Sequence, residues 1–390
     1  MSLVAALCVP AWCTSQHLDP AQLLIRKASG SLTNAVYFVS YPPSPSIPTI
    51  LLRIYGPSSG SLISRSRELH ILHVLSSRYH IGPRIYGTFS NGRIEEYFDS
   101  VTLDPSDIRD GKISRWIGAR MAELHSVEIT AVEGPLAVGS LEGKSWEIGG
   151  KKNVKTWLPA AREVLAHPSL DEGDRAALNL DVFLEAWTRY LRWLSQIEKA
   201  EGASRRVFAH NDTQYGNLLR LTGKPAEGTP EHRQVSVCSM VSIKRTDAFP
   251  ELVVVDFEYA SPNPLAFEIA NHFHEWTADY CSSTPHLLNA SRYPTAEQRR
   301  NFYQAYLSHA HIPSKTSTVD VSGEARLAKL ERQVRLWSPA SHGMWAIWGI
   351  VQAKDDVAKD RTGTEAEFDY IGYAKCRMEN FFREIATLGV

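Results

Sequence analysis

The sequence predicts an α+β fold in which a small antiparallel β-sheet with one helix is followed by a larger, mostly helical region. Short runs of β-branched and aromatic residues, separated by turn residues, fill the first hundred positions and are typical of strands. Beyond about residue 105, apolar residues recur at helical spacing instead. With 390 residues, 43% of them hydrophobic, the chain is long enough for two domains. We expect these domains at 1–98 and 99–390.

Each predicted element follows from a local pattern. In the first region, β-branched and aromatic runs predict four strands, at 35–39, 49–55, 84–87 and 92–98. Apolar positions among charged ones predict a helix over 64–79 that carries Glu68. The same spacing predicts helices near 113–126, 172–199, 296–309, 324–336, 342–355 and 366–387. Polar stretches with Gly, Pro and Ser are expected to form surface loops at 131–152 and 221–250.

Composition argues against several functional classes. A formal net charge of -1 gives no bulk attraction to nucleic acid or to an anionic membrane. The longest apolar stretch, Gly343 to Ala353, is shorter than the roughly 20 residues of a membrane-spanning helix. The five cysteines are scattered and lack the spacing of a metal site, which favours a reduced, cytoplasmic protein. We therefore expect a small-molecule partner, no nucleic acid and no integral membrane segment.

One polar block and one strand end carry the predicted chemistry. The block His210-Asn211-Asp212-Thr213-Gln214-Tyr215-Gly216-Asn217 follows an apolar segment, and Asp256 follows the apolar run 252–255. Phosphoryl transfer requires a carboxylate that positions a hydroxyl and oxygen ligands that hold magnesium. We expect Asp212 to act as the base, Asn217 and Asp256 to hold Mg²⁺, and His210 to support the loop. An Asx turn is the alternative interpretation of the block.

The expected contacts to a nucleotide are weaker signals when each is taken alone. Ser29-Gly30-Ser31-Leu32-Thr33-Asn34 combines small residues ahead of a strand, which lets backbone amides approach phosphates, but a plain β-turn has the same composition. Arg53 paired with Glu68 would reproduce the strand-to-helix ion pair of kinases, with an exposed salt bridge as the alternative. Glu258 supports the metal through water or is a simple loop carboxylate.

Together these segments resemble the choline/ethanolamine kinase family, within the wider group of aminoglycoside-phosphotransferase-like kinases. The resemblance extends over nearly the whole chain, and the Gln214-Tyr215 pair is most similar to fungal choline kinases. Apart from the block at 210–217, it rests on ordered segments at 29–35, 51–56, 82–89, 256–260, 270–276, 341–348 and 368–370.

The resemblance implies a two-lobed protein-kinase-like fold with an active site in the cleft between the lobes. It also implies Mg²⁺-dependent transfer of the ATP γ-phosphoryl group to choline, giving phosphocholine and ADP, the first step of the CDP-choline route to phosphatidylcholine. An ethanolamine kinase or a dual enzyme is the alternative, and a catalytically inactive amine-binding protein is the alternative outside the enzymes. The oligomeric state is open, with a homodimer as one expectation. The expected ATP contacts are Ser31, Thr33, Asn34, Arg53, Glu68, Glu96 and Phe98.

The charge of choline gives a separate reason to consider the aromatic residues. A trimethylammonium group offers no hydrogen-bond donor, so its site is expected to combine aromatic faces with a carboxylate. Trp345 and Trp348 are three positions apart and share a helical face, although tryptophans at this spacing are more often core residues. By resemblance, Gln214 and Glu275 lie near the cationic head. The full set of expected choline contacts is Gln214, Tyr259, Glu275, Trp276, Tyr280, Trp345, Trp348 and Tyr370, with Tyr373 as a further member.

Two segments depart from the family pattern. Val235 to Pro250, between the catalytic block and Asp256, resembles an insertion that is either a surface loop or an artefact of the gene prediction. On the adenine side, Glu96-Tyr97-Phe98-Asp99 is followed by Ser100-Val101-Thr102, where relatives often carry arginines. The nucleotide contacts of this segment are therefore left open.

Overall fold

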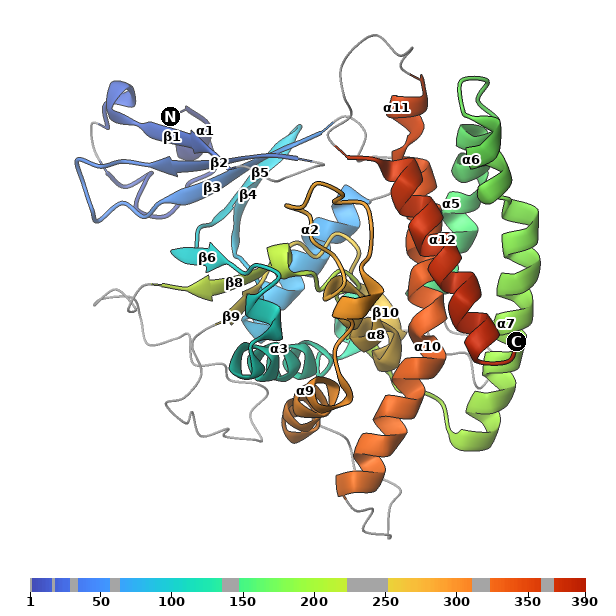
Figure 1. The fold of residues 1–390 in the computed structure, drawn as a ribbon. Coiled ribbons are helices and arrows are strands. Elements are labelled where there is room, and N and C mark those ends of the chain that lie inside the picture. Colours follow the sequence, from blue (N-terminus) through green and yellow to red (C-terminus); the bar gives the residue numbers. More distant parts are fainter. Residues whose placement is uncertain are drawn as a thin grey trace. The chain divides into compact units, whose positions relative to one another are not determined.

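The computed structural model describes residues 2–15, 18–28, 34–56, 64–134, 147–222, 252–310, 323–358 and 368–390 (Figure 1). The chain divides into two compact units, Met1–Thr102 with Leu218–Tyr259, and Leu103–Asn217 with Ala260–Val390. The segment Leu218–Tyr259 thus belongs to the first unit, whereas the sequence placed it in the second domain. The division into 1–98 and 99–390 stays a prediction.

A five-stranded antiparallel sheet is the centre of the first unit. Its strand order is β1-β2-β3-β5-β4, and its strands are β1 Leu24–Lys27, β2 Asn34–Ser40, β3 Ile50–Tyr55, β4 Ile85–Phe89 and β5 Gly92–Glu96. The four strands predicted from sequence are confirmed. β1 was missed because all four of its residues are exposed, so that it lacks the alternation of a half-buried strand. Helix α2, Arg65–Val74, continues into a π-helical turn, Leu75–Tyr79.

The apolar N-terminal segment belongs to the core of this unit. After the short helix α1, Ser2–Ala6, the buried side chains of Val9 and Trp12 join a hydrophobic cluster with Ile50 and Ile94 of the sheet. Trp12 Nε1 donates a hydrogen bond to the carbonyl of Pro48 at 2.9 Å. The segment therefore covers apolar sheet residues that would otherwise face water.

A second, three-stranded sheet in the first unit brings together segments far apart in the sequence. Its order is β6-β8-β9, with β6 Ser100–Thr102, β8 Leu218–Leu221 and β9 Leu252–Val254, all antiparallel. The strand predicted ahead of Asp256 is thus confirmed as β9. Residues 223–251 lie outside the described residues. They include the proposed insertion and all but the first two residues of the loop predicted at 221–250.

Helices dominate the second unit, as predicted. They are α3 Gly111–Leu124, α4 Ile129–Glu133, α5 Gly149–Leu165, α6 Glu172–Ala177, α7 Leu180–Glu201, α8 Leu265–Glu275, α9 Ala296–His309, α10 Gly323–Gln352, α11 Lys354–Ala358 and α12 Tyr370–Thr387. Helix α12 lies along α10, which also packs against α5 and α8 (Figure 1). Within the described residues, no helix is both long and apolar enough to cross a membrane.

Three helical predictions needed correction. The expected helices at 324–336 and 342–355 form one helix, α10, that continues through Pro339. Its second half is almost wholly buried and the helix packs against α5, α8 and α12, which outweighs the local cost of proline. The expected helix at 172–199 is interrupted, and Asn179 caps α7 by accepting from the amides of Asp181 and Val182.

The predicted surface loop at 131–152 was wrong at both ends, while 135–146 lie outside the described residues. Its first residues belong to α4 and its last to α5. The two glycines that suggested a loop, Gly149 and Gly150, begin α5 because they permit close packing. A Cβ on Gly150 would approach Phe267 Cε2 to 2.9 Å.

A two-stranded sheet in the second unit positions the polar block. The buried strand β7, Arg206–Ala209, pairs antiparallel with β10, Ser261–Pro264, and the block begins directly after β7. Helix α8 begins directly after β10. The polar block and α8 therefore start from the same small sheet.

Candidate active site

Glu268 of α8 holds the loop of residues 210–217, which is predicted to be catalytic and is called the catalytic loop below. Its Oε1 accepts hydrogen bonds from the backbone amides of His210 (3.0 Å) and Asn211 (3.3 Å) and from Thr213 Oγ1 (2.8 Å). Its Oε2 lies 2.5 Å from His125 Nε2. Burial by itself would raise the pKa of Glu268, but His125, His210 and Thr213 together hold that pKa below its usual value. A buried carboxylate thus holds the loop at three residues, two through the backbone and one through a side-chain hydroxyl.

Two further polar residues of α8 hold the same loop. Asn271 Nδ2 donates to the carbonyl of Asn211 at 3.0 Å, and His272 Nδ1 lies 2.8 Å from the carbonyl of Thr213. With Glu268 they occupy positions i, i+3 and i+4, which share one face of a helix. Every residue of α8 is buried. These three residues were not predicted to hold the loop, although polar side chains at this spacing in an apolar helix were a signal for them.

Asp212 and Asn217 lie together, as a base and a metal ligand require. Asn217 Nδ2 donates to Asp212 Oδ2 at 3.0 Å and to the carbonyl of Asp212 at 2.9 Å. Both bonds use Nδ2, and Oδ1 of Asn217 accepts no hydrogen bond from the described residues. This oxygen could bind Mg²⁺, which prefers oxygen ligands. His210 Nδ1 accepts from the amide of Asp212 at 3.2 Å, the supporting position expected of it.

Two non-glycine residues in the segments with the expected catalytic carboxylates have left-handed backbone conformations. Asn211, which precedes Asp212, has φ 67°, and Asp256 itself has φ 69°. Such conformations cost free energy in residues other than glycine and persist where surrounding bonds hold them. At Asn211 these include the bond from Asn263 Nδ2 to Oδ1 at 2.7 Å. Of the five non-glycine residues with positive φ in the described part of the chain, these two lie in the segments to which the sequence assigned chemistry.

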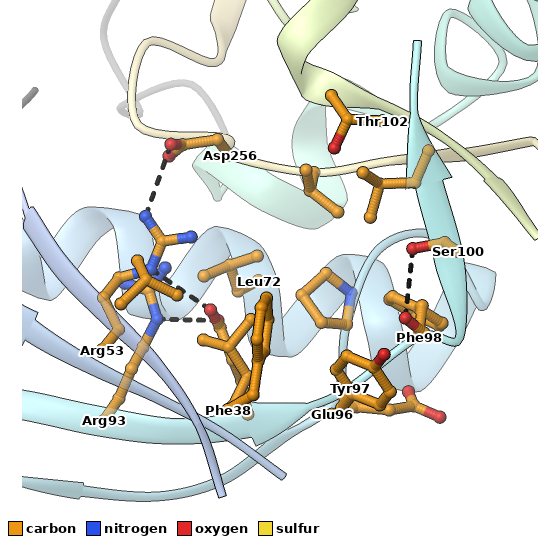
Figure 2. A pocket seen from close by; sticks show the side chains of 16 residues that line it. Phe38, Arg53, Leu72, Arg93, Glu96, Tyr97, Phe98, Ser100, Thr102 and Asp256 are labelled. Atoms are coloured by element: carbon orange, nitrogen blue, oxygen red, sulfur yellow. Dashed lines mark hydrogen bonds and ion pairs between the residues drawn. The ribbon is translucent and has the colours of Figure 1, made fainter. Parts of the chain in front are cut away.

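In the first unit, Arg53 makes different contacts from those predicted. Its Nε donates to Glu95 Oε1 at 3.1 Å, and its Nη1 lies 3.3 Å from Asp256 Oδ2 (Figure 2). Glu68 instead pairs with Arg93 at 2.7 Å and with Arg65 at 2.8 Å. Within the described residues no ion pair joins Arg53 to Glu68, so that predicted pairing was wrong.

The reason lies in the register of the sheet, which places Arg53 of β3 directly opposite Arg93 of β5. Two facing cations in a buried position are stable only if carboxylates separate them. Glu95 does this, because its Oε2 also accepts from Arg93 Nε at 2.9 Å. Burial would lower the pKa of Arg53, but Glu95 and Asp256 hold it above its usual value. No residue spacing in the sequence indicated this cross-strand network.

Glu258 lies beside this network but is weakly paired. Its Oε2 is 3.8 Å from Arg65 Nη1, beyond hydrogen-bond distance. Burial, with contributions from Asp256 and Glu68, raises the pKa of Glu258 to about 8. A buried carboxyl next to a second carboxylate is stabilised by a bound cation. The carboxylate oxygens of Asp256 and Glu258 are suitable ligands for a divalent metal ion.

A cavity of about 220 Å³ lies next to Arg53 in the same unit (Figure 2). Apolar side chains form one part of its wall, and Arg53, Arg93, Glu95 and Asp256 form another. An apolar part next to guanidinium groups suits a base and its phosphates. Of the predicted ATP contacts, Arg53, Glu96 and Phe98 line the cavity, Asn34 and Glu68 do not, and Ser31 and Thr33 lie outside the described residues.

In the second unit, six aromatic residues form a group that we call the aromatic cluster. Trp345 and Trp348 are in contact at a centroid distance of 5.2 Å, and Trp348 also contacts Tyr370 (5.8 Å) and Tyr373 (5.7 Å). Phe368, which the predicted set omitted, contacts Tyr370 at 5.0 Å and Tyr280 at 6.5 Å. The cluster comprises Tyr280, Trp345, Trp348, Phe368, Tyr370 and Tyr373.

The aromatic cluster adjoins the catalytic loop. Tyr215 of the loop accepts a hydrogen bond at its hydroxyl from the amide of Tyr280 at 2.8 Å. Trp345 Nε1 donates to Asn271 Oδ1 at 2.7 Å, and Asn271 holds the loop. The charge of Asp212 also acts on the buried hydroxyl of Tyr373 and contributes to its raised pKa, after burial itself. The proposed base and the cluster thus belong to one site within this unit.

Glu275 lies at the end of α8 with both carboxylate oxygens hydrogen-bonded. Arg377 Nη2 donates to Oε1 at 2.8 Å, and the hydroxyl of Tyr280 donates to Oε2 at 2.6 Å. Arg377 is fully buried and also donates from Nε to the hydroxyl of Tyr373 at 3.0 Å. The carboxylate expected to balance a substrate cation therefore already carries a cationic partner, which the sequence analysis did not foresee.

Three of the expected choline contacts have other surroundings. Trp276 is fully buried, packs edge-on against Phe273 and donates from Nε1 to His272. Gln214 Oε1 accepts from the amide of Gly216 at 2.7 Å, within its own loop. Tyr259 belongs to the first unit and is buried. Their assignment to the choline site stays a prediction.

His274, His342 and Glu384 form a cluster beside Arg377 in which both histidines are buried and Glu384 is partly buried. The two imidazole rings are stacked with centroids 3.7 Å apart and planes inclined by 18°. A metal ion lies near the plane of each ring that binds it, so face-to-face rings are poorly arranged to share one. Burial and the neighbouring His274 lower the pKa of His342 to about 3, which leaves it neutral. Its Nδ1 can then accept from Arg377, at 3.5 Å.

The arrangement of the chain defines its class. Plasmodium vivax ethanolamine kinase has the same fold, with a TM-score of 0.70 at 20% identity over 97% of this chain and 86% of that one. This confirms the predicted α+β, protein-kinase-like fold, with an antiparallel sheet and a helix in its N-terminal part and a largely helical C-terminal part.

The sequence comparison then identifies the family. Residues 25–382 match the family described as choline/ethanolamine kinase, and the chain belongs to it. It is 34% identical to a choline kinase of Schizosaccharomyces pombe over 95% of this chain and 84% of that protein. It is also 34% identical to a choline kinase of Saccharomyces cerevisiae, over 90% of this chain and 62% of that longer protein.

Proposed function

We propose that the protein is a choline kinase, which transfers the γ-phosphoryl group of ATP to the hydroxyl of choline and forms phosphocholine and ADP. The observation that carries the proposal is the pairing of Asp212 with Asn217 in a loop that adjoins the aromatic cluster. A base, a metal ligand and a surface for a quaternary cation are thereby combined in one unit. The similarity to fungal choline kinases supports the same acceptor.

The residues take the following roles in this proposal. Asp212 accepts the hydrogen bond of the choline hydroxyl and takes its proton as the phosphoryl group transfers. Asn217, Asp256 and Glu258 hold Mg²⁺, which neutralises charge on the phosphate oxygens when bound. Arg53 contacts phosphates at the edge of the cavity that receives the adenine. The aromatic cluster binds the trimethylammonium group through cation–π contacts, each worth roughly 2 kcal/mol when desolvated.

The test uses purified protein with ATP, Mg²⁺ and either choline or ethanolamine, and measures the phosphorylated amine and ADP. We expect phosphocholine to form with choline, and product formation to stop when Mg²⁺ is chelated. The absence of turnover with both amines would contradict the enzyme proposal and favour an amine-binding protein without catalysis. Turnover of ethanolamine alone would assign the alternative substrate.

The cluster itself supplies the test of the acceptor. Trp348→Ala removes the ring that contacts three other aromatic residues, and we expect the KM for choline to rise about 10-fold or more, because one desolvated cation–π contact of roughly 2 kcal/mol is lost. Trp193→Ala, at a ring of α7 stacked on Tyr190, is the matched control. An equal effect of both changes would indicate that Trp348 acts through folding alone.

A further inference from the structure

The carboxylate at the acceptor site has an unusual environment for a group that binds a cation. Arg377 donates to one oxygen of Glu275 at 2.8 Å and Tyr280 to the other at 2.6 Å. Arg377 and Glu275 are both buried, so their charges are screened little by solvent and largely cancel. The pair presents a polar but nearly neutral wall to a ligand.

Arg377 is held firmly in this position. Besides Glu275, its Nε donates to the hydroxyl of Tyr373, and its guanidinium lies 5.1 Å from the centre of that ring. The neutral His342 faces Nη1 at 3.5 Å. Three neighbours thus fix the guanidinium, and a substrate amine cannot displace it from Glu275 without leaving a buried cation uncompensated.

Primary and quaternary ammonium groups differ in what such a wall offers them. The ammonium of ethanolamine has three N–H donors that are strongly hydrated and need acceptors when they leave water. Trimethylammonium has no N–H donor, and aromatic faces stabilise it directly. At Glu275 each oxygen already accepts one bond, from Arg377 or Tyr280. Desolvation therefore costs the primary amine more than the quaternary one.

We propose that Arg377 and Tyr280, by occupying and neutralising Glu275, make this site select quaternary over primary ammonium alcohols. Arg377 is a positioning residue in this scheme, because it acts through the carboxylate. The inference rests on the proposed choline kinase activity and adds the structural basis of its selectivity.

The wild-type protein provides a first test through a series of acceptors with increasing N-methylation. With ethanolamine, N-methylethanolamine, N,N-dimethylethanolamine and choline, we expect kcat/KM to rise at each step, because each methyl group removes one N–H donor that the site satisfies poorly. A flat or inverted series would overturn the inference while leaving the kinase proposal intact. A lack of turnover with every amine would instead refute the kinase proposal.

Tyr280→Phe tests the mechanism, because it keeps the ring in the aromatic cluster and frees Oε2 of Glu275. We expect the ratio of kcat/KM for choline to that for ethanolamine to fall about 10-fold, the value of one hydrogen bond to a charged acceptor. Tyr190→Phe, which removes a buried hydroxyl that donates to the carbonyl of Leu336, is the matched control and should leave the ratio unchanged.

Arg377→Lys provides an independent variant should Tyr280→Phe fold poorly. Lysine keeps the positive charge but not the fixed, planar geometry, so we expect the ratio to fall less than with Arg377→Gln, which leaves Glu275 without a cation. Arg299→Lys, in the ion pair with Glu331, controls for the loss of a guanidinium elsewhere in the unit. An unchanged ratio in both Arg377 variants would overturn the role of this residue.

Discussion

The catalytic loop of the second unit and the Arg53 network of the first unit are held in place by different kinds of interaction. In the loop, backbone amides and carbonyls are bound by side chains of one buried helix, with Glu268 at the centre. In the network, Arg53 and Arg93 are held mainly by the carboxylates of Glu95, Glu68 and Asp256. Directional bonds to a backbone fix a base in one geometry, whereas an ion-pair network can exchange one anion for another.

This difference suits the two expected tasks. The base must lie within hydrogen-bond distance of the acceptor hydroxyl, and small displacements cost large factors in rate. Arg53 must meet phosphate groups, which compete with Glu95 and Asp256 for the same guanidinium. We therefore expect damage to the loop to lower kcat and damage to the network to weaken nucleotide binding.

Removing the base is the largest predicted perturbation. Asp212→Ala should lower kcat by about 10²- to 10⁴-fold, the usual contribution of a general base, while ATP binding is retained. Phosphocholine formation and an ATP titration measure the two quantities. Asp181→Ala, at an exposed carboxylate paired with Arg162, is the control. Substantial activity in Asp212→Ala would show that another group takes the proton.

The second prediction compares matched changes in the two regions. Glu268→Gln weakens three bonds to the loop and should lower kcat about 10- to 100-fold with a smaller change in the KM for ATP. Glu95→Gln removes the charge between Arg53 and Arg93 and should mainly raise the KM for ATP. Steady-state kinetics at varied ATP distinguish these outcomes. If both variants changed kcat and the KM for ATP in the same way, the loop and the Arg53 network would not differ in function as we propose.

The third prediction concerns the packing of the segment that carries Asp256. Gly82 has φ 74°, and a Cβ there would lie 2.8 Å from Phe257 Cε2. Gly134 has φ 75° with no atom within 4 Å of its Cβ position, which makes it a matched control for backbone strain. Gly82→Ala should therefore lower the free energy of unfolding by about 1–3 kcal/mol more than Gly134→Ala. Denaturant titration measures the difference, and equal losses would show that Phe257 can move aside.

A further prediction concerns the response to acid of His342, whose Nδ1 lies 3.5 Å from Arg377. The pKa of His342 is about 3 in the folded chain and 6.5 in its unperturbed form, so the unfolded state binds more protons between these values. Stability from this residue should fall as pH decreases through that window, by up to about 1.4 kcal/mol per pH unit. Glu95, whose pKa is lowered by Arg53 and Arg93 against the effect of burial, loses its contribution only below about 4.5.

His342→Gln tests this prediction. Between pH 6.5 and about 5, the variant should lose less stability per pH unit than the wild type, because glutamine has no proton to gain. Thermal or urea unfolding at several pH values provides the slopes. Identical slopes would mean that His342 binds protons equally in the folded and the unfolded state.

The sequence by itself determined the class of fold, the strands at 35–39 and 92–98, and the position of the polar loop at 210–217 directly after a buried strand. These features depend on local patterns: alternation in strands, helical spacing of apolar residues, and polar residues at a strand end. The elements that were missed or predicted wrongly are those in which tertiary packing outweighs the local sequence pattern. Helix α10 continues through Pro339, α5 begins at two glycines, and β1 is wholly exposed.

Only the tertiary structure decided which charged residues meet. The sequence placed Glu68 with Arg53, but the register of β3 and β5 brings Arg93 opposite Arg53 and makes Glu95 their shared anion. In the same way, Arg377 approaches Glu275 across 102 positions of sequence. Local spacing contains no information about such partners, because they are set by strand register and helix packing, whereas the identity of a catalytic loop is fixed by consecutive residues.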